Sequence, residues 1–150
     1  MGGIGCALME ELDSSWWDPH FLRRSTAFRM FDHLIDPATI PEKHPSLDYL
    51  NGILDKSGGC VSEGGSQISF VEQGAKHKAF ESIYDVRIYE RGEVQTRNNW
   101  HDFFNALSWA AFPKAKVAVN ARYYRSMLPW RDSWMTDRPR SAEEHLMCLI

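Results

Sequence analysis

Several features that define common protein classes are scarce or absent in this 150-residue chain. Its three cysteines, Cys6, Cys60 and Cys148, lie far apart and form no C-x-x-C pair. Their spacing argues against a zinc knuckle or a disulfide framework and favours a reducing compartment. The longest apolar stretch, residues 103–112, is interrupted by two polar residues and is well short of the roughly 20 residues that span a bilayer. We therefore expect a cytoplasmic protein without a membrane span.

Motifs for nucleophilic catalysis and for phosphate binding are also missing. No G-x-S-x-G elbow occurs, and the glycine-rich stretch SGGCVSEGGSQ lacks the G-K-[ST] ending of a phosphate loop. The net charge of -3 and the pI of about 6.1 argue against nucleic acid as the partner. The charge is uneven, however, because residues 94–131 carry six basic side chains and only Asp102 as an acid. This basic segment is compatible with a small anionic ligand, with nucleic acid as a further alternative, or with contact between the halves of the chain.

The composition is that of a globular protein. Hydrophobic residues make up 43% of the chain and charged residues 25%, with no repeats or low-complexity tracts. A chain of this length is long enough to bury a core, and its six Trp, eight Phe and five Tyr predict an aromatic interior. We expect one domain over residues 1–150.

Helices are predicted from apolar spacing and from residues that cap helix ends. Residues 20–35 show an apolar stripe at helical spacing, and Ser46 is a plausible N-cap for a second helix. Asn98 or Asn99 can cap a later helix, and Pro113 begins another, at a position where its missing N–H has no cost.

Between these helices the apolar period changes to two. QISFVE alternates inward and outward, and so does YDVRIYE, in which Tyr84, Val86 and Ile88 form one side. The Arg91-Gly92 pair before EVQT predicts a tight hairpin turn, with Gly supplying the positive φ. The predicted fold class is therefore α+β: a small antiparallel sheet of about three strands, flanked by amphipathic helices and ending in a helical hairpin.

A polar motif, RNNWHDFFNAL, marks the helix predicted after the sheet. His101 and Asn105 share one stripe of this helix, and Asn120 lies on the inner side of the following helix. If the two helices pack antiparallel, these three side chains meet between them. Arg97 and Asn99 then lie at the mouth of the same region, near backbone N–H groups that favour anions.

One interpretation of the motif is structural. Asn99 caps the helix, Asp102 complements its N-terminus, and Asn105 and Asn120 satisfy each other. The protein is then a binding or assembly module without a catalytic role for these residues. The sequence favours this interpretation, because structural networks place polar groups together as functional sites do.

The alternative interpretation is a metal- or small-molecule-dependent enzyme. His101 acts as an acid/base or a metal ligand, and Asp102 is its carboxylate partner. A lone His-Asp doublet is a weak signal, and no second histidine lies at i±4 to form a metal pair, so neither a metal nor a cofactor can be named. The candidate ligand-binding residues are Arg97, Asn99, Asn105 and Asn120.

The segment YDVRIYERGEVQTRNNWHDFFNALSWAAFPKAKVAVNARYY closely resembles the hallmark of an uncharacterised, mainly proteobacterial family, the domain of unknown function numbered thirty twenty-five. The family pattern falls here on Thr96, Arg97, Asn99, His101, Asp102, Phe103, Phe104, Asn105, Trp109, Phe112, Pro113, Lys116 and Asn120. SLDYLNGIL and ISFVEQ are similar to its lead-in, so the family-like core covers roughly residues 46–125.

The resemblance implies an uncharacterised bacterial protein, and the family has no established activity to transfer. It also implies a longer chain, because family members continue past a segment like RSAEEH. Residues 129–150 are therefore either a loose tail or a truncated continuation.

Overall fold

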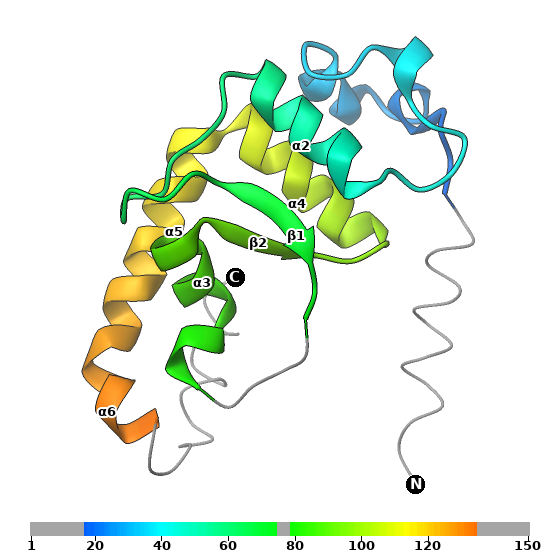
Figure 1. Ribbon diagram of the computed structural model, residues 1–150. Helices are drawn as coiled ribbons and strands as arrows, with labels where there is room; N and C mark the ends of the chain where they lie inside the picture. The colour runs from blue at the N-terminus through cyan, green and yellow to red at the C-terminus, as the bar shows by residue number, and fades with distance from the viewer. Residues whose placement is uncertain (1–16, 75–78, 135–150) are drawn as a thin grey trace, which may run out of the picture.

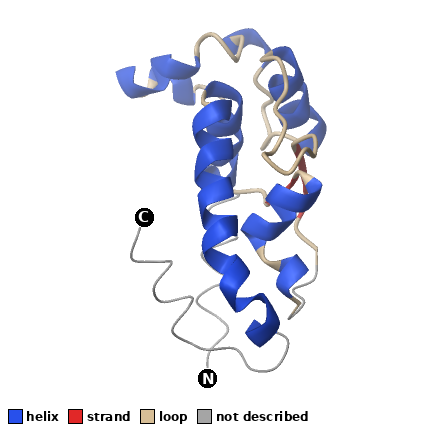
Figure 2. Cartoon of the chain, turned by 90° about the vertical axis from the view of Figure 1, so that its left-hand side faces the viewer, coloured by secondary structure: helices blue, strands red, loops and turns tan. Residues whose placement is uncertain are grey.

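The computed structural model describes residues 17–74 and 79–134 (Figure 1). The elements in chain order are η1 (Phe21–Arg23), η2 (Thr26–Phe31), η3 (Pro37–Thr39), α2 (Leu47–Lys56), β1 (Ser69–Glu72), η4 (Phe80–Ser82), α3 (Tyr84–Arg91), β2 (Glu93–Thr96), α4 (Trp100–Ala111), α5 (Pro113–Met127), η5 (Leu128–Trp130) and α6 (Arg131–Trp134). Helices dominate both views, and the strands form only a small patch (Figure 2). No helix within these two ranges is long and apolar enough to cross a bilayer.

The α+β class is confirmed, but the predicted sheet of three antiparallel strands is wrong. The sheet has two strands, β1 and β2, which pair in parallel with Phe70 opposite Val94. The segment predicted as the middle strand is the helix α3, which connects the two strands. Parallel strands need such a crossover, because a tight turn can join only antiparallel neighbours.

The period-two pattern of α3 arises because this helix is buried on two sides. Val86 packs in a small cluster with Phe80 and Met127, whereas Ile88 belongs to the main core. Residues two positions apart on a helix point about 200° apart, so two opposite buried sides mimic the alternation of a strand. Tyr84, the third residue of the pattern, is 38% exposed.

Gly92 has the positive φ that was predicted, but in a different structural role. With φ 72° it ends α3 as a left-handed C-cap, and its N–H donates to the carbonyls of Arg87 and Ile88. A Cβ at this position would lie 1.9 Å from the backbone oxygen of Gln67. Glycine is therefore required both for the helix end and for the close approach of the neighbouring chain.

The main core lies between α2, the sheet and α4. The prediction for α2 is confirmed, because the Ser46 side chain accepts a hydrogen bond from the Tyr49 N–H at 3.2 Å. The Asn51 side chain also binds the outer edge of β1: its amide donates to the Phe70 carbonyl at 3.0 Å and accepts from the Phe70 N–H at 2.8 Å. The α2 helix thereby covers a strand edge that would otherwise be open to other chains.

The segment predicted as a helix over residues 20–35 forms two short 3-10 helices, η1 and η2. Part of its apolar side is still buried, because Phe21, Phe31 and Ile35 lie in the main core, whereas Ala27 is exposed. Aromatic packing onto α4, rather than a long hydrogen-bonded helix, holds this segment in place.

The start of α5 at Pro113 is confirmed, but the predicted antiparallel hairpin of α4 and α5 is not formed. The helix α5 leaves α4 at an angle and packs mainly along α3 (Figure 1). The rings of Tyr89 and Tyr124 stack at 3.8 Å between these two helices. Of the segment predicted as a loose tail, residues 129–134 are helical, and residues 135–150 lie outside the described ranges.

Candidate functional site

The carboxylate of Asp102, in the first turn of α4, is the centre of a polar cluster. Its Oδ2 accepts hydrogen bonds from the backbone N–H of Arg97 at 2.8 Å and from Arg97 Nε at 3.0 Å. Its Oδ1 lies 2.7 Å from His101 Nδ1. The backbone N–H of Asp102 donates to Asn99 Oδ1 at 2.8 Å, which confirms Asn99 as the N-cap of α4. The motif therefore closes around the start of its own helix.

These contacts keep Asp102 ionised. Its side chain is buried, and desolvation by itself favours the neutral acid. The hydrogen bonds from Arg97 and His101, together with the Arg97 charge, outweigh this effect and hold the pKa of Asp102 below its ordinary value. An ionised carboxylate can only accept, so the proton between the two groups lies on His101 Nδ1.

His101 is the one member of this cluster that points mainly to solvent. Its side chain is 83% exposed, although Nδ1 remains bound to Asp102. With the proton on Nδ1, the neutral ring presents Nε2 as an acceptor. The arrangement orients the imidazole but does not enclose it.

Asn105, one turn further along α4, connects to both α3 and α5. Its Nδ2 donates to the Tyr84 hydroxyl at 2.9 Å, and its Oδ1 accepts from Lys116 Nζ at 2.7 Å. Lys116 Nζ also lies over the Trp109 ring, 5.2 Å from the ring centroid. Three helices therefore meet at this one amide.

Asn120 is buried and faces α3 rather than α4. Its Nδ2 donates to the backbone carbonyl of Asp85 at 2.9 Å and to the Asp85 carboxylate at 3.1 Å. Burial raises the pKa of Asp85, while the Asn120 bond and the Lys116 charge act in the opposite direction. Asn120 thus ties α5 to the first turn of α3.

The predicted meeting of His101, Asn105 and Asn120 is therefore wrong in its contacts. Each binds a different partner, because α5 runs along α3 instead of returning along α4. The network still joins the three helices, through Tyr84 and Asp85 of α3. The sequence-based interpretation missed these two residues because it placed them in a strand.

Burial governs the ionisation of the two groups that bind Asn105. Desolvation raises the pKa of Tyr84 to about 12, against the effect of its Asn105 hydrogen bond, so the hydroxyl keeps its proton at neutral pH. Desolvation lowers the pKa of Lys116, and the Asp85 charge opposes this shift. The charges of Asp102, Asp85 and Arg97 also act on Tyr84, so both ends of the network influence one another.

The basic side chains of residues 94–131 do not form one continuous surface. Arg97 binds Asp102, Arg125 pairs with Glu63, and Arg131 lies over the Phe80 ring. Lys116 turns inward over Trp109. Most of the charge that could attract a polyanion is thus engaged within the described part of the protein.

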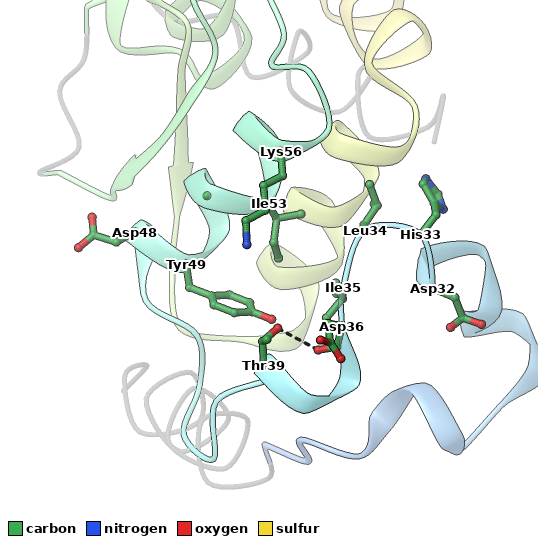
Figure 3. A pocket seen from close by; sticks show the side chains of 11 residues that line it. Asp32, His33, Leu34, Ile35, Asp36, Thr39, Asp48, Tyr49, Ile53 and Lys56 are labelled. Atoms are coloured by element: carbon green, nitrogen blue, oxygen red, sulfur yellow. Dashed lines mark hydrogen bonds between the residues drawn. The ribbon is translucent and has the colours of Figure 1, made fainter.

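A hollow of about 590 Å³ lies elsewhere, between residues 32–39 and α2 (Figure 3). Tyr49 extends across it toward Asp36 and Thr39, whereas Asp48 points away from the other lining side chains. None of the predicted site residues lines this hollow. It is therefore separate from the polar network.

A metal site would need several ligating side chains close together. Within residues 17–74 and 79–134, no three His, Cys, Asp or Glu side chains are grouped to hold a metal ion. Cys60, which is buried, is a free thiol whose pKa burial raises. His101 and Asp102 are thus a pair without a third such ligand among the described side chains.

Comparison with known proteins confirms the family resemblance and adds no activity. Neither the curated proteins nor the solved structures gave a match to this chain. The family model described as "Protein of unknown function (DUF3025)" matches residues 68–143, just over half of the chain. This match covers β1, all three helices of the polar network and the RNNWHDFFNAL motif. The chain therefore belongs to this family of proteins of unknown function.

Proposed function

We propose that this protein is a non-catalytic binding or assembly module, whose Arg/Asn/His/Asp motif is a structural network. One observation carries the proposal: the polar groups of the motif are bonded to one another or to α3 and α5. Arg97 binds Asp102, Asn105 binds Tyr84 and Lys116, and Asn120 binds Asp85. Buried groups such as Asp102 and Asn120, whose bonds lie within the network, position helices more readily than they bind a substrate.

The energetic argument rests on burial. Asp102 and Asn120 are both less than a tenth exposed, and an unmatched buried polar group costs about 1–3 kcal/mol. Their bonds connect the start of α4 to Arg97 and connect α5 to α3. The network therefore stabilises a particular arrangement of three helices, which apolar packing alone would not specify.

The test compares two neighbouring residues of the motif. Asp102→Ala should lower the free energy of unfolding by about 2–3 kcal/mol, because it removes a buried carboxylate that binds Arg97 and His101. His101→Ala should cost about 0.5 kcal/mol or less, because its side chain is 83% exposed. Both values come from urea denaturation of the full chain, followed by circular dichroism.

A destabilisation by His101→Ala as large as that by Asp102→Ala would contradict the assignment of the network. So would an Asp102→Ala protein as stable as wild type. Asn105→Ala provides an intermediate control, because Asn105 is only half-buried and both its partners keep access to water.

A second candidate function is acid–base chemistry by His101 and Asp102. The observation that favours it is the contact of His101 Nδ1 with Asp102 Oδ1 at 2.7 Å, which would orient the ring and leave Nε2 to take up a proton. Metal analysis and native mass spectrometry of the purified full chain test it. A metal or small molecule that the wild type retains and the folded His101→Ala protein loses would favour this candidate over the first.

A further inference from the structure

The bonds around Asn105 leave one proton directed out of the network. Lys116 Nζ can only donate, so the Asn105 atom facing it at 2.7 Å must be the oxygen. The amide nitrogen then faces the Tyr84 hydroxyl at 2.9 Å and donates to it. Because Tyr84 Oη accepts this bond, its own O–H proton must point to a different acceptor.

Among the described residues, nothing accepts that proton. The hydroxyl of Tyr84 and the two remaining N–H groups of Lys116 have no further hydrogen-bond partner within residues 17–74 and 79–134. Tyr84 as a residue is 38% exposed, so an external molecule can contact it. Tyr84 and Lys116 bind the nitrogen and the oxygen of the same Asn105 amide, so their spare donors belong to groups held by one side chain.

The start of α5 adds a favourable field at the same place. Lys116 lies in the first turns of this 15-residue helix, which has no side-chain cap and no acidic residue in its first turn. The backbone N–H groups of Lys114 and Ala115 are therefore uncapped at the positive end of the helix dipole. From this turn Lys116 Nζ reaches Asn105 and the Trp109 ring of α4.

The two nearby carboxylates are already engaged. Asp85 acts on Lys116 through its charge but is bound by Asn120, and no ion pair joins it to Lys116. Asp102 is bound by Arg97 and His101. Within residues 17–74 and 79–134, Lys116 thus has no carboxylate in direct contact, whereas Arg97 pairs with Asp102.

We propose that Tyr84, Asn105 and Lys116 form a binding site for the carboxylate group of a small molecule. Tyr84 Oη–H and Lys116 Nζ–H donate to the carboxylate oxygens, and Asn105 holds both donors in place. A single lysine matches the single charge of a carboxylate, whereas a phosphate monoester carries nearly two charges at neutral pH. This inference deepens the proposed function, because it takes the network as a preformed support for a ligand.

The experiment is an NMR titration of the ¹⁵N-labelled full chain with sodium acetate, at constant pH and ionic strength against sodium chloride. We expect saturable shifts at the amides of Lys114 and Ala115 and at the Asn105 side chain. Tyr84→Phe, which keeps the ring, and Lys116→Gln should each weaken acetate binding by about tenfold, since each removes one hydrogen bond to a charged group. Inorganic phosphate is the second probe and should bind more weakly than acetate.

Matched controls are available on the same helix. Lys114→Gln removes an exposed cation from the same turn, and Tyr123→Phe removes a hydroxyl from α5; each should change acetate binding by less than about twofold. The proposal is overturned if acetate gives no saturable shift, if Lys114→Gln weakens binding as much as Lys116→Gln, or if phosphate binds more tightly than acetate. The unfolding results for Asp102 and His101 are independent of all three outcomes, so the two proposals can fail separately.

Discussion

One side of α4 packs against aromatic rings of residues 17–31, whereas its first turn binds Arg97 and its opposite side binds polar groups of α3 and α5. On the aromatic side, Phe103 contacts the rings of Trp17 and Phe21 at centroid distances of 4.9 Å and 5.3 Å. On the polar side, Asn105 contacts Tyr84 and Lys116 through single hydrogen bonds. The same helix is therefore held by two kinds of interaction.

The aromatic side accounts for most of the stability of α4, and the polar side accounts for the specific placement of its neighbours. Ring packing buries a large apolar area, and the resulting hydrophobic stabilisation, which is non-directional, supplies most of the stability. Hydrogen bonds contribute only about 1 kcal/mol each, but they require a particular distance and angle and are lost when a partner is displaced. The aromatic side thus holds η1 and η2 on α4, and the polar side determines how α3 and α5 are placed.

Removing one ring from the aromatic side of α4 should change the stability more than any other substitution discussed below. Phe103→Ala should lower the free energy of unfolding by about 3–5 kcal/mol, because Phe103 is almost fully buried among five aromatic rings. Phe112→Ala is the matched control, since Phe112 is 46% exposed, and it should cost about 1 kcal/mol or less. Urea denaturation measures both, and equal losses would show that the cluster is not a main source of stability.

The stabilisation contributed by the polar side should depend on pH, whereas that of the aromatic side should not. The pKa of Asp102 is lowered in the folded protein, so its stabilisation is present above the unfolded pKa of about 3.9 and is lost as the pH falls through the folded pKa. Asp102→Asn should therefore lose less stability than wild type between pH 5 and pH 3, by on the order of 1 kcal/mol. Urea denaturation at a series of pH values measures this difference.

Asp85 provides the control of opposite sign. Its folded pKa is raised, so its contribution grows as the pH falls and partly offsets the loss at Asp102. Asp85→Asn should accordingly lose more stability than wild type over the same range. Parallel pH profiles for wild type and both variants would mean that neither carboxylate is held as the network requires.

The smallest expected effect is a gain in stability from a substitution in α2, which packs against α4. Gly52 lies in the middle of α2, and a Cβ built there meets no atom within 4 Å. Gly52→Ala should raise the free energy of unfolding by about 0.5–1 kcal/mol, because alanine restricts the unfolded chain. Gly64→Ala is the contrasting control, since its Cβ would lie 2.3 Å from the Tyr89 carbonyl oxygen. A destabilised Gly52→Ala protein would show that the space beside α2 is not free.

The sequence predicted the local features of the fold correctly. Ser46 and Asn99 cap their helices, and Pro113 begins α5. These features depend on contacts within three or four residues, which any sequence displays directly. The buried residues of α2 followed from helical spacing for the same reason.

The candidate site was predicted only in part. The pairing of His101 with Asp102 and the cap at Asn99 are contacts between sequence neighbours, and the sequence indicated both residues. The partners of Asn105 and Asn120 lie 21 and 35 residues away on α3, in a segment predicted as a strand. A correct prediction would have required knowing that α3 is buried on two sides.

From the sequence, then, followed the ends of α2 and α4, the start of α5 and the polar character of the start of α4. These depend on short-range hydrogen bonds and on apolar spacing within one element. The tertiary structure decided whether Tyr84 to Arg91 was a strand or a helix, and where α5 would pack. A period of two fits a half-buried strand and also a helix between two apolar clusters, so only the presence of Phe80 and Met127 on its second side resolved the choice.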